Sequence, residues 1–443
     1  MAHTILRFWT GLLAALIALL AALPLAHGIP AFARRYETSC TTCHIAFPRL
    51  TPFGEAFRRN AYRFPDNGDA TAEKEEPLSL GNEAMRERFP EAVWPGQMPR
   101  ALPLSLVVDG NAQFGPEPET HGHATAAMAG MEMPDNHDLG QLRLGALGGH
   151  VGLRAGGSLG DLAAVFASVD VGGHEPIAVE RGFLLLTPTG PTALHLRVGR
   201  FEPELHGMSL HRGMFNHQLR LNTTAVGDNP WTPEPYTTGA ELSGVAWGRT
   251  AWALGVAENA PGSTGMRKDF YGRVEVKVGG MRLDGRDAQA GSAAWRERSL
   301  HLGASGWSGR SAILAGGMPL YDDNFLRVGV DVHAIWDDIL VDVVAARQSH
   351  EHPDSTLATA HVFDLLLAEV TWMASGAFFP TARLEASRLD HGLSQPDERW
   401  LGSLLLTALV RPNLILRLEG AMGAEPGDEA EFRAAAVQFL TAF

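Results

Sequence analysis

The sequence contains only two cysteines in 443 residues, Cys40 and Cys43. Two cysteines leave room for one disulfide, one redox dithiol, half of a zinc site or one covalently attached cofactor. Beyond residue 23 there is no run of eighteen apolar residues, so no transmembrane helix is predicted there. The chain also lacks a phosphate-binding glycine-rich loop before a helix, and no hydrolase or transferase constellation is evident.

Basic residues are also fewer than acidic ones. The chain has 36 Lys and Arg against 50 Asp and Glu, which gives a formal net charge of −14. This acidity argues against nucleic acid as a partner and favours cationic partners such as metal ions.

Residues 1–28 have the pattern of a cleaved export signal. Arg7 supplies the positive region, residues 8–23 are apolar and rich in Leu and Ala, and Ala26-His27-Gly28 is a small-x-small cleavage site. The small residues at the cleavage site and the lack of a basic stop-transfer segment after it argue against an uncleaved membrane anchor. No cysteine stands at the cleavage point, which argues against a lipoprotein. We therefore expect an exported protein.

The segment Cys40-Thr41-Thr42-Cys43-His44 has the spacing of a c-type haem attachment site. In such a site the cysteines form thioether bonds to the haem, and the histidine is an axial ligand of the iron. A zinc site would need further Cys or His nearby, but none follows until His121. A redox dithiol would usually lie in a thioredoxin-like βαβ unit, and the sequence around the motif lacks that pattern. We predict one covalent haem c, and a structural disulfide remains the alternative.

Residues 29–66 form the predicted haem segment. Thr51-Pro52 indicates the N-cap and first residue of a short helix. Phe53 and Phe57 are four apart and share one face of that helix, where they either shield a haem from water or simply pack on their neighbours. Residues 67–100 are charged and then rich in proline, which predicts a linker.

Over residues 101–443 the hydrophobic period changes to two. In residues 194–200 and 273–278, Leu or Val alternates with charged or small residues, which predicts strands with one apolar face. We expect short turns at 156–157, 189–191, 279–280, 306–309 and 411–413, and longer connections at 115–139, 203–236, 284–296, 350–357 and 422–430. Short turns on one side and long loops on the other are typical of an outer-membrane barrel.

The predicted fold class is therefore all-β. It is a transmembrane antiparallel β-barrel of about 16–18 strands with a short N-terminal α-helical monohaem cytochrome c segment. The alternating C-terminal stretch that ends in Phe443 fits a last barrel strand. The alternative is a soluble β-sandwich, but that fold would need a polar outer surface opposite the charged face, and here that face is Leu, Val, Phe and Ala.

Two of the long connections carry residues that bind metals. The first holds clustered Met and His, which favour copper, beside carboxylates, which suit Fe(II); its candidates are His121, His123, Met131, Met133 and His137. The second is long enough to enter a barrel and offer a distal haem ligand; its candidates are His206, Met208, His211, Met214 and His217. Met85 and Met98 of the linker are the alternatives for this ligand. The alternative for both sets is an ordinary polar loop.

Phe32-Ala33-Arg34-Arg35 before the motif, and Pro48, Leu50, Phe53 and Gly54 after it, resemble the fused monohaem cytochrome–porin family. The resemblance covers only this segment, and the barrel agrees in pattern alone. It implies that Cys40 and Cys43 are the thioether attachments and His44 the proximal ligand.

The function that the resemblance implies is an outer-membrane electron-transfer conduit, as in outer-membrane Fe(II) oxidases. Such a protein accepts electrons from extracellular Fe(II) and passes them to a periplasmic cytochrome or cupredoxin. The alternative is a metal or solute porin, copper-related in one version, whose haem segment acts as a plug or sensor.

Overall fold

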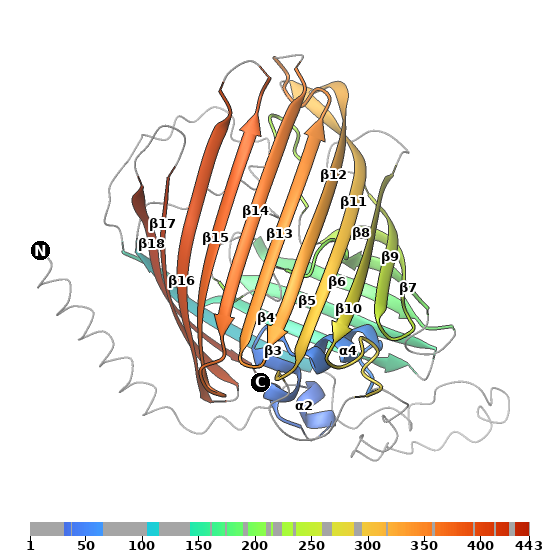
Figure 1. Ribbon diagram of the computed structural model, residues 1–443, viewed down its shortest axis with the longest axis vertical. Coiled ribbons are helices and arrows are strands. Elements are labelled where there is room, and N and C mark those ends of the chain that lie inside the picture. Colours follow the sequence, from blue (N-terminus) through green and yellow to red (C-terminus); the bar gives the residue numbers. More distant parts are fainter. Residues whose placement is uncertain are drawn as a thin grey trace, which may run out of the picture.

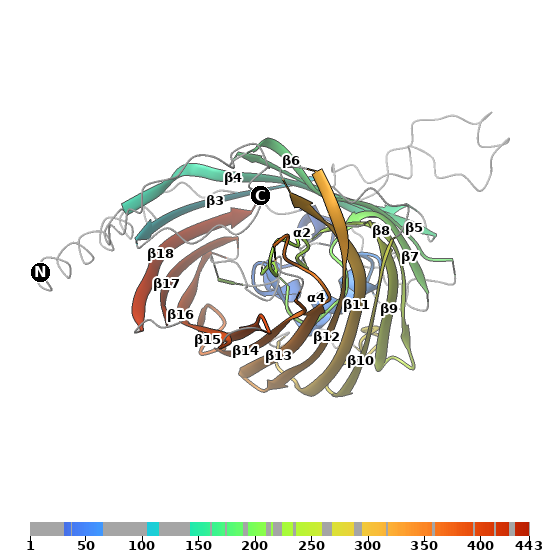
Figure 2. The same ribbon diagram turned by 90° about the horizontal axis from the view of Figure 1, so that it is seen from above.

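The computed structural model describes residues 31–36, 38–64, 104–114, 142–159, 162–172, 175–188, 194–209, 214–215, 224–233, 236–258, 268–287, 295–315, 318–356, 359–392, 395–411, 413–424 and 430–442. Within these residues, sixteen antiparallel strands form one closed barrel, in which each strand pairs with the next and β18 pairs with β3 (Figures 1 and 2). The prediction of 16–18 strands is confirmed at its lower bound. Closure removes every free sheet edge, as a lipid environment requires.

The barrel strands have the following bounds: β3 (Leu104–Phe114), β4 (Leu142–Leu159), β5 (Ala163–Gly172), β6 (Glu175–Leu186), β7 (His195–Phe201), β8 (Thr237–Ala246), β9 (Thr250–Ala257), β10 (Asp269–Gly279), β11 (Arg298–Ala315), β12 (Met318–Trp336), β13 (Ile339–His350), β14 (His361–Trp372), β15 (Phe378–Asp390), β16 (Asp397–Arg411), β17 (Leu414–Ala424) and β18 (Glu431–Ala442). None of the described helices is long and apolar enough to cross a bilayer.

The alternation along the strands is the reverse of that in a soluble protein. On β10, Val274, Val276 and Val278 face outward and are exposed, whereas Glu275 and Lys277 between them are buried in the lumen. Exposed Leu and Val recur on β11, β12, β14, β15 and β16. An apolar outer face around a charged interior is the arrangement of a membrane barrel and excludes the soluble sandwich.

Two of the predicted turns are wrong, because their glycines lie inside strands. Gly156 is in β4, where an added Cβ would lie 2.9 Å from the ring of Phe166 on β5. Gly309 is in β11, where an added Cβ would lie 2.3 Å from the ring of Phe325 on β12. These glycines make room for an aromatic ring on the neighbouring strand. The predicted turn at 279–280 and the predicted loop at 284–296 belong to one connection, between β10 and β11.

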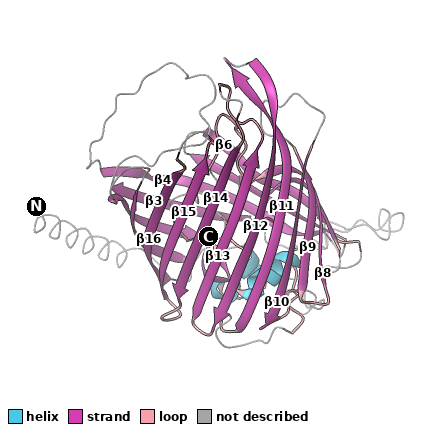
Figure 3. Cartoon of the chain, turned by 45° about the horizontal axis from the view of Figure 1, so that its top comes forward, coloured by secondary structure: helices cyan, strands magenta, loops and turns pink. Residues whose placement is uncertain are grey.

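The N-terminal segment lies inside the barrel. It consists of α2 (Ala31–Arg35), α3 (Cys40–Cys43), β1 (His44–Ala46), β2 (Arg49–Leu50) and α4 (Pro52–Arg59). In Figure 2, which looks along the barrel, its blue ribbon lies within the ring of strands, and Figure 3 shows its helices in cyan. We call residues 31–64 the plug.

The plug lies at one end of the barrel (Figure 1). Arg49 of the plug contacts two residues of the barrel wall, Asp342 and Glu369. Both lie close to short turns, at 337–338 and 373–377. Short turns face the periplasm in barrels of this kind, and long loops face outward. The plug therefore occupies the end that corresponds to the periplasmic mouth.

Helix α4 begins where the sequence predicts. Thr51 is its N-cap, and its hydroxyl oxygen accepts a hydrogen bond of 3.1 Å from the backbone N–H of Gly54. Pro52 takes the first helical position, where the missing N–H costs nothing. The buried ring of Phe57 packs edge-on against the ring of Phe32 in α2, with centroids 5.3 Å apart.

The outward face provides a test of membrane insertion. Val330 is 58% exposed at the middle of the part of β12 that pairs with β13. Replacing Val330 with Arg should lower the free energy of unfolding in lipid vesicles by about 2–4 kcal/mol, because an outward charge at mid-membrane is desolvated. Denaturant titration of the refolded barrel measures this change. As a control, Ile339→Arg at the strand end should cost about 0–1 kcal/mol, and equal costs at the two sites would contradict this orientation.

Candidate functional site in the barrel lumen

The two cysteines lie on one helical turn that helix α4 braces. Both are free thiols. The backbone N–H of Thr51 donates to the carbonyl of Cys43 (2.9 Å), and the Thr51 hydroxyl donates to the carbonyl of Thr42 (2.8 Å). An added Cβ on Gly54 would lie only 2.1 Å from the same Cys43 carbonyl, so only glycine allows this close approach. The motif is therefore held rigidly.

His44 directly follows this turn and starts β1. Its ring nitrogen Nδ1 is hydrogen-bonded to the carbonyl oxygen of Pro48 at 3.3 Å. A bond of this kind fixes the tautomer and leaves Nε2 as the nitrogen that can bind a metal. Loss of solvation lowers the pKa of His44 to about 4, so the imidazole is neutral at physiological pH. The neutral imidazole is the form that ligates metals.

These residues fit a haem group. The donor set consists of two thiols on one turn and an oriented, neutral histidine directly after them. Burial raises the pKa of the Cys43 thiol to about 12, so this thiol is not a reactive thiolate of the kind found in redox dithiols. The two thiols on one turn with an oriented histidine directly after them are the donor set that a haem attachment site requires.

A buried ionic network ties the plug to the barrel wall and to the β7–β8 connection. Arg49 of the plug pairs with Asp342 on β13 and with Glu369 on β14. Glu369 also pairs with Arg383 on β15 at 2.7 Å. The guanidinium of Arg383 stacks 3.9 Å from the ring centre of Phe215, in the β7–β8 connection. The two carboxylates outweigh the burial that disfavours the charge and raise the pKa of Arg49 above its ordinary range.

Four further plug residues bond to different parts of the interior. Two make ion pairs and two donate to backbone oxygens: Arg58 with Glu204 (2.6 Å), Arg59 with Glu275 (3.2 Å), Asn60 with the carbonyl of Asp284 (3.0 Å) and Arg63 with the carbonyl of Ala163 (2.8 Å). Because these contacts reach β5, β10 and the β7–β8 and β10–β11 connections, they fix the orientation of the plug as well as its depth.

The β7–β8 connection, residues 202–236, carries the predicted candidates for a distal ligand. Met214 is fully buried in a cluster with Ile45 and Ala46 of the plug. Met208 packs instead on β13 and β14, and His206 lines a cavity beside Arg49. The remaining candidates lie outside the described residues: His211 and His217 here, Met85 and Met98 of the linker, and His121, His123, Met131, Met133 and His137 of the first long connection.

A pair of lumenal histidines was not predicted from the sequence. His301 on β11 and His333 on β12 are register partners, and their ring centres are 4.9 Å apart. Nδ1 of His301 contacts Glu275 at 2.9 Å, and Nδ1 of His333 contacts Asp342 at 2.6 Å. Each histidine stands at an inward-facing position of its strand, which the alternation of residues predicts. That the two lie side by side depends on the register between β11 and β12.

No family model matches the sequence, and no curated protein matches it. Solved structures do match. The outer membrane channel DcaP of Acinetobacter baumannii aligns over 77% of this chain and 96% of its own, with 12% identity and a TM-score of 0.54. An anion-selective porin from Comamonas acidovorans aligns over 77% and 99%, with 14% identity and a TM-score of 0.51. OprB of Pseudomonas putida aligns over 83% and 99%, with 10% identity and a TM-score of 0.50.

The chain is a porin-like β-barrel. At these identities the similarity establishes the fold alone. Together with the apolar outer face, it places this porin-like barrel in the outer membrane, as the sequence predicts.

The Arg49 pairs provide a test of how the plug is held. Arg49→Ala removes one partner from each of two buried carboxylates. Because Glu369 keeps Arg383 and Asp342 keeps His333, docking of the plug should weaken by about 2–3 kcal/mol, less than for a buried charge left fully unpaired. Limited proteolysis of the refolded barrel should then cleave residues 31–64 much faster than in the wild type. The matched control is Arg347→Ala, which breaks an ion pair with Asp364 whose side chains are 61% and 37% exposed, and it should cost at most about 1 kcal/mol. Unchanged cleavage in Arg49→Ala would show that the pairs do not hold the plug.

Proposed function

We propose that the protein is an outer-membrane electron-transfer conduit, in which the plug carries one covalent haem c inside a porin-like barrel. The observation that supports this proposal is the position of the Cys40–His44 turn, which is braced by α4 and joined to the wall through Arg49. A bound haem would supply one-electron exchange at its iron.

The residues of the chain have separate roles in this proposal. Cys40 and Cys43 hold the group covalently, and His44 ligates the iron through Nε2. The carbonyl of Pro48 orients the His44 ring. Met214 is buried in one cluster with Ile45 and Ala46, the two residues that follow His44. Among the described candidates we therefore propose Met214 as the distal ligand.

The proposed partners follow from where the plug lies. At the periplasmic mouth it is positioned for exchange with a periplasmic cytochrome or cupredoxin. Extracellular Fe(II) is the proposed donor, which would make the protein an Fe(II) oxidase. Fe(III) precipitates at neutral pH, so oxidation at the cell surface keeps the product outside. The net charge of −14 favours the approach of cations.

The contents of the lumen support the movement of electrons. Aromatic rings extend from the plug onto the wall: Tyr62 stacks on Phe166 (5.4 Å), and Phe166 stacks on Phe183 (5.7 Å). A second aromatic group surrounds Trp231 of the β7–β8 connection, and Phe183 packs against it. Packed rings leave contact-scale gaps between π-systems, whereas a solute needs a continuous path of water.

A second candidate function is a metal or solute porin in which the plug closes or senses the channel. The comparisons support this candidate better than electron transfer, because the matched structures are described as a channel and an anion-selective porin. In its copper-related form, the Met and His residues of the first long connection would bind the metal.

The haem proposal predicts a covalent adduct. Full-length protein from cells that mature c-type cytochromes should keep haem peroxidase staining after denaturing electrophoresis, because thioether bonds survive denaturation. The double variant Cys40→Ala/Cys43→Ala should lose the stain. Thr41→Ala alters a spacer residue of the same turn and should keep it. Staining that persists without both cysteines would exclude attachment at this motif.

The two candidate functions differ in what crosses the membrane. A conduit reconstituted in vesicles should show reduced-haem absorbance bands after Fe(II) is added outside, together with low ion conductance. Arg49→Ala should raise the conductance, because the plug is then held less firmly. High conductance in the wild type together with a haem that ignores Fe(II) would favour the porin function instead.

A further inference from the structure

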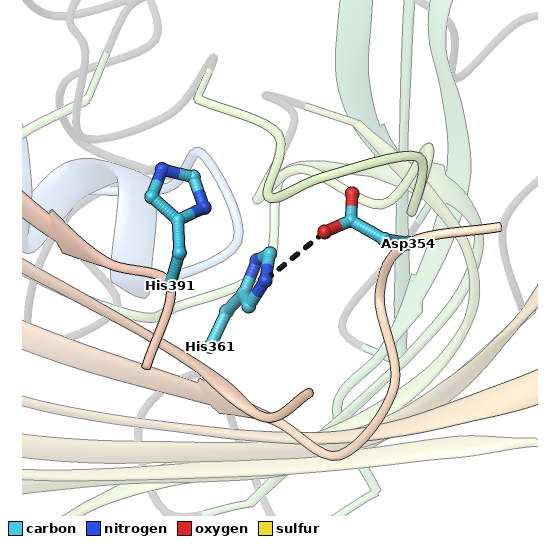
Figure 4. A group of neighbouring side chains, drawn as sticks. All are labelled: Asp354, His361 and His391. Atoms are coloured by element: carbon cyan, nitrogen blue, oxygen red, sulfur yellow. Dashed lines mark ion pairs between the residues drawn. The ribbon is translucent and has the colours of Figure 1, made fainter. Parts of the chain in front are cut away.

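Three side chains converge at the other end of the lumen, far from the plug. Asp354 lies in the β13–β14 connection, His361 is the first residue of β14, and His391 follows the last residue of β15. One ligand atom from each lies within 4.8 Å of the other two. Figure 4 shows His361 between Asp354 and His391.

Strand register brings the two histidines together. Val362 on β14 pairs with Asp390 on β15, so the next residues outward, His361 and His391, are neighbours at the rim. Their ring centres are 4.7 Å apart. The odd-numbered positions of β14 and β15 face the lumen, as buried Glu369 and Arg383 show. The cluster therefore faces into the mouth of the barrel at the end with the long loops.

The hydrogen bonds around the cluster resemble those of a metal site. Nε2 of His361 is 3.0 Å from a carboxylate oxygen of Asp354. Two ligands that each bind one ion at about 2.1 Å lie about 3.0–3.4 Å apart, so this spacing suits a shared ion. Nε2 of His391 contacts Asp397 at 3.2 Å, and a carboxylate that holds the far nitrogen of a ligating histidine is the usual second contact.

One buried atom in the cluster has no partner. The His361 side chain is fully buried, and its Nδ1 makes no hydrogen bond in the part of the chain that the structure describes. The neighbouring His350 differs, because its two nitrogens contact Asp323 and Gln348. His350 is satisfied by protein groups, whereas one ring nitrogen of the buried His361 is without a hydrogen bond among the described residues and lies beside a second imidazole.

We propose that Asp354, His361 and His391 bind one divalent first-row transition-metal ion at the outer mouth of the lumen. Two imidazoles and one carboxylate suit such an ion and leave positions open for water or another ligand. Binding draws the His391 ring inward, which its position beyond the end of β15 allows. This site does not depend on haem, which would attach at the opposite end of the barrel.

Zn²⁺ titration of the full-length barrel in detergent, followed by calorimetry, tests the proposal. Asp354→Asn and His391→Ala should each weaken the site at least about tenfold, and Asp397→Asn should weaken it about 10–100-fold by releasing His391. His352→Ala removes an exposed histidine of the same connection and should bind like the wild type. Ca²⁺ should not compete, because imidazole prefers transition metals.

Several results would overturn the proposal. Wild-type affinity in Asp354→Asn and His391→Ala would show that the cluster is only an ion pair with a neighbouring ring. Displacement of Zn²⁺ by Ca²⁺ would exclude the proposed class of ion. Haem staining of the same samples reports on the proposed function separately, so the two proposals fail independently. Far-UV circular dichroism confirms that each variant keeps the barrel.

Discussion

The structure depends on the pairing of charges inside the barrel. Lipid requires apolar side chains on the outside, so the alternate positions turn their charged groups inward. A charge removed from water is costly unless an opposite charge meets it with good geometry. The wall places Asp342, Glu369 and Glu275 in the lumen, and the plug supplies Arg49 and Arg59 to meet them. The plug is thus a counter-charge to the wall.

The same requirement organises the β7–β8 connection. Glu204 of this connection pairs with Arg58 of the plug, and Phe215 receives the stacked guanidinium of Arg383 on the wall. Plug, wall and connection share one network, so a change in any of them alters the partners of the other two. Interactions within such a network are not additive. The position of the Cys40–His44 turn therefore depends on wall residues that never touch it.

Local features of the fold are visible in the sequence, and the contacts between distant segments are not. The period of two along residues 273–278 predicts a strand and its two faces, and Thr51-Pro52 predicts the start of α4. Arg49, in contrast, meets partners 293 and 320 residues away, which only barrel closure brings near. Glycines such as Gly309 misled the turn predictions, because glycine serves both turns and close packing of rings. Histidine pairs such as His361 and His391 depend on strand register, which a single sequence leaves open.

The two ends of the lumen carry different chemistry, and this asymmetry bears on what passes between them. The plug with its Cys40–His44 turn occupies the periplasmic mouth, and the cluster around His361 occupies the outer one. Any movement of the plug out of the lumen would break the buried Arg49 pairs, which leaves Glu369 with Arg383 alone and Asp342 with His333 alone. In the proposed conduit, an electron would move while the packed rings and bonded side chains stay in place. The cost of moving the plug therefore bears on both proposed functions, whereas the comparisons establish the porin-like fold alone.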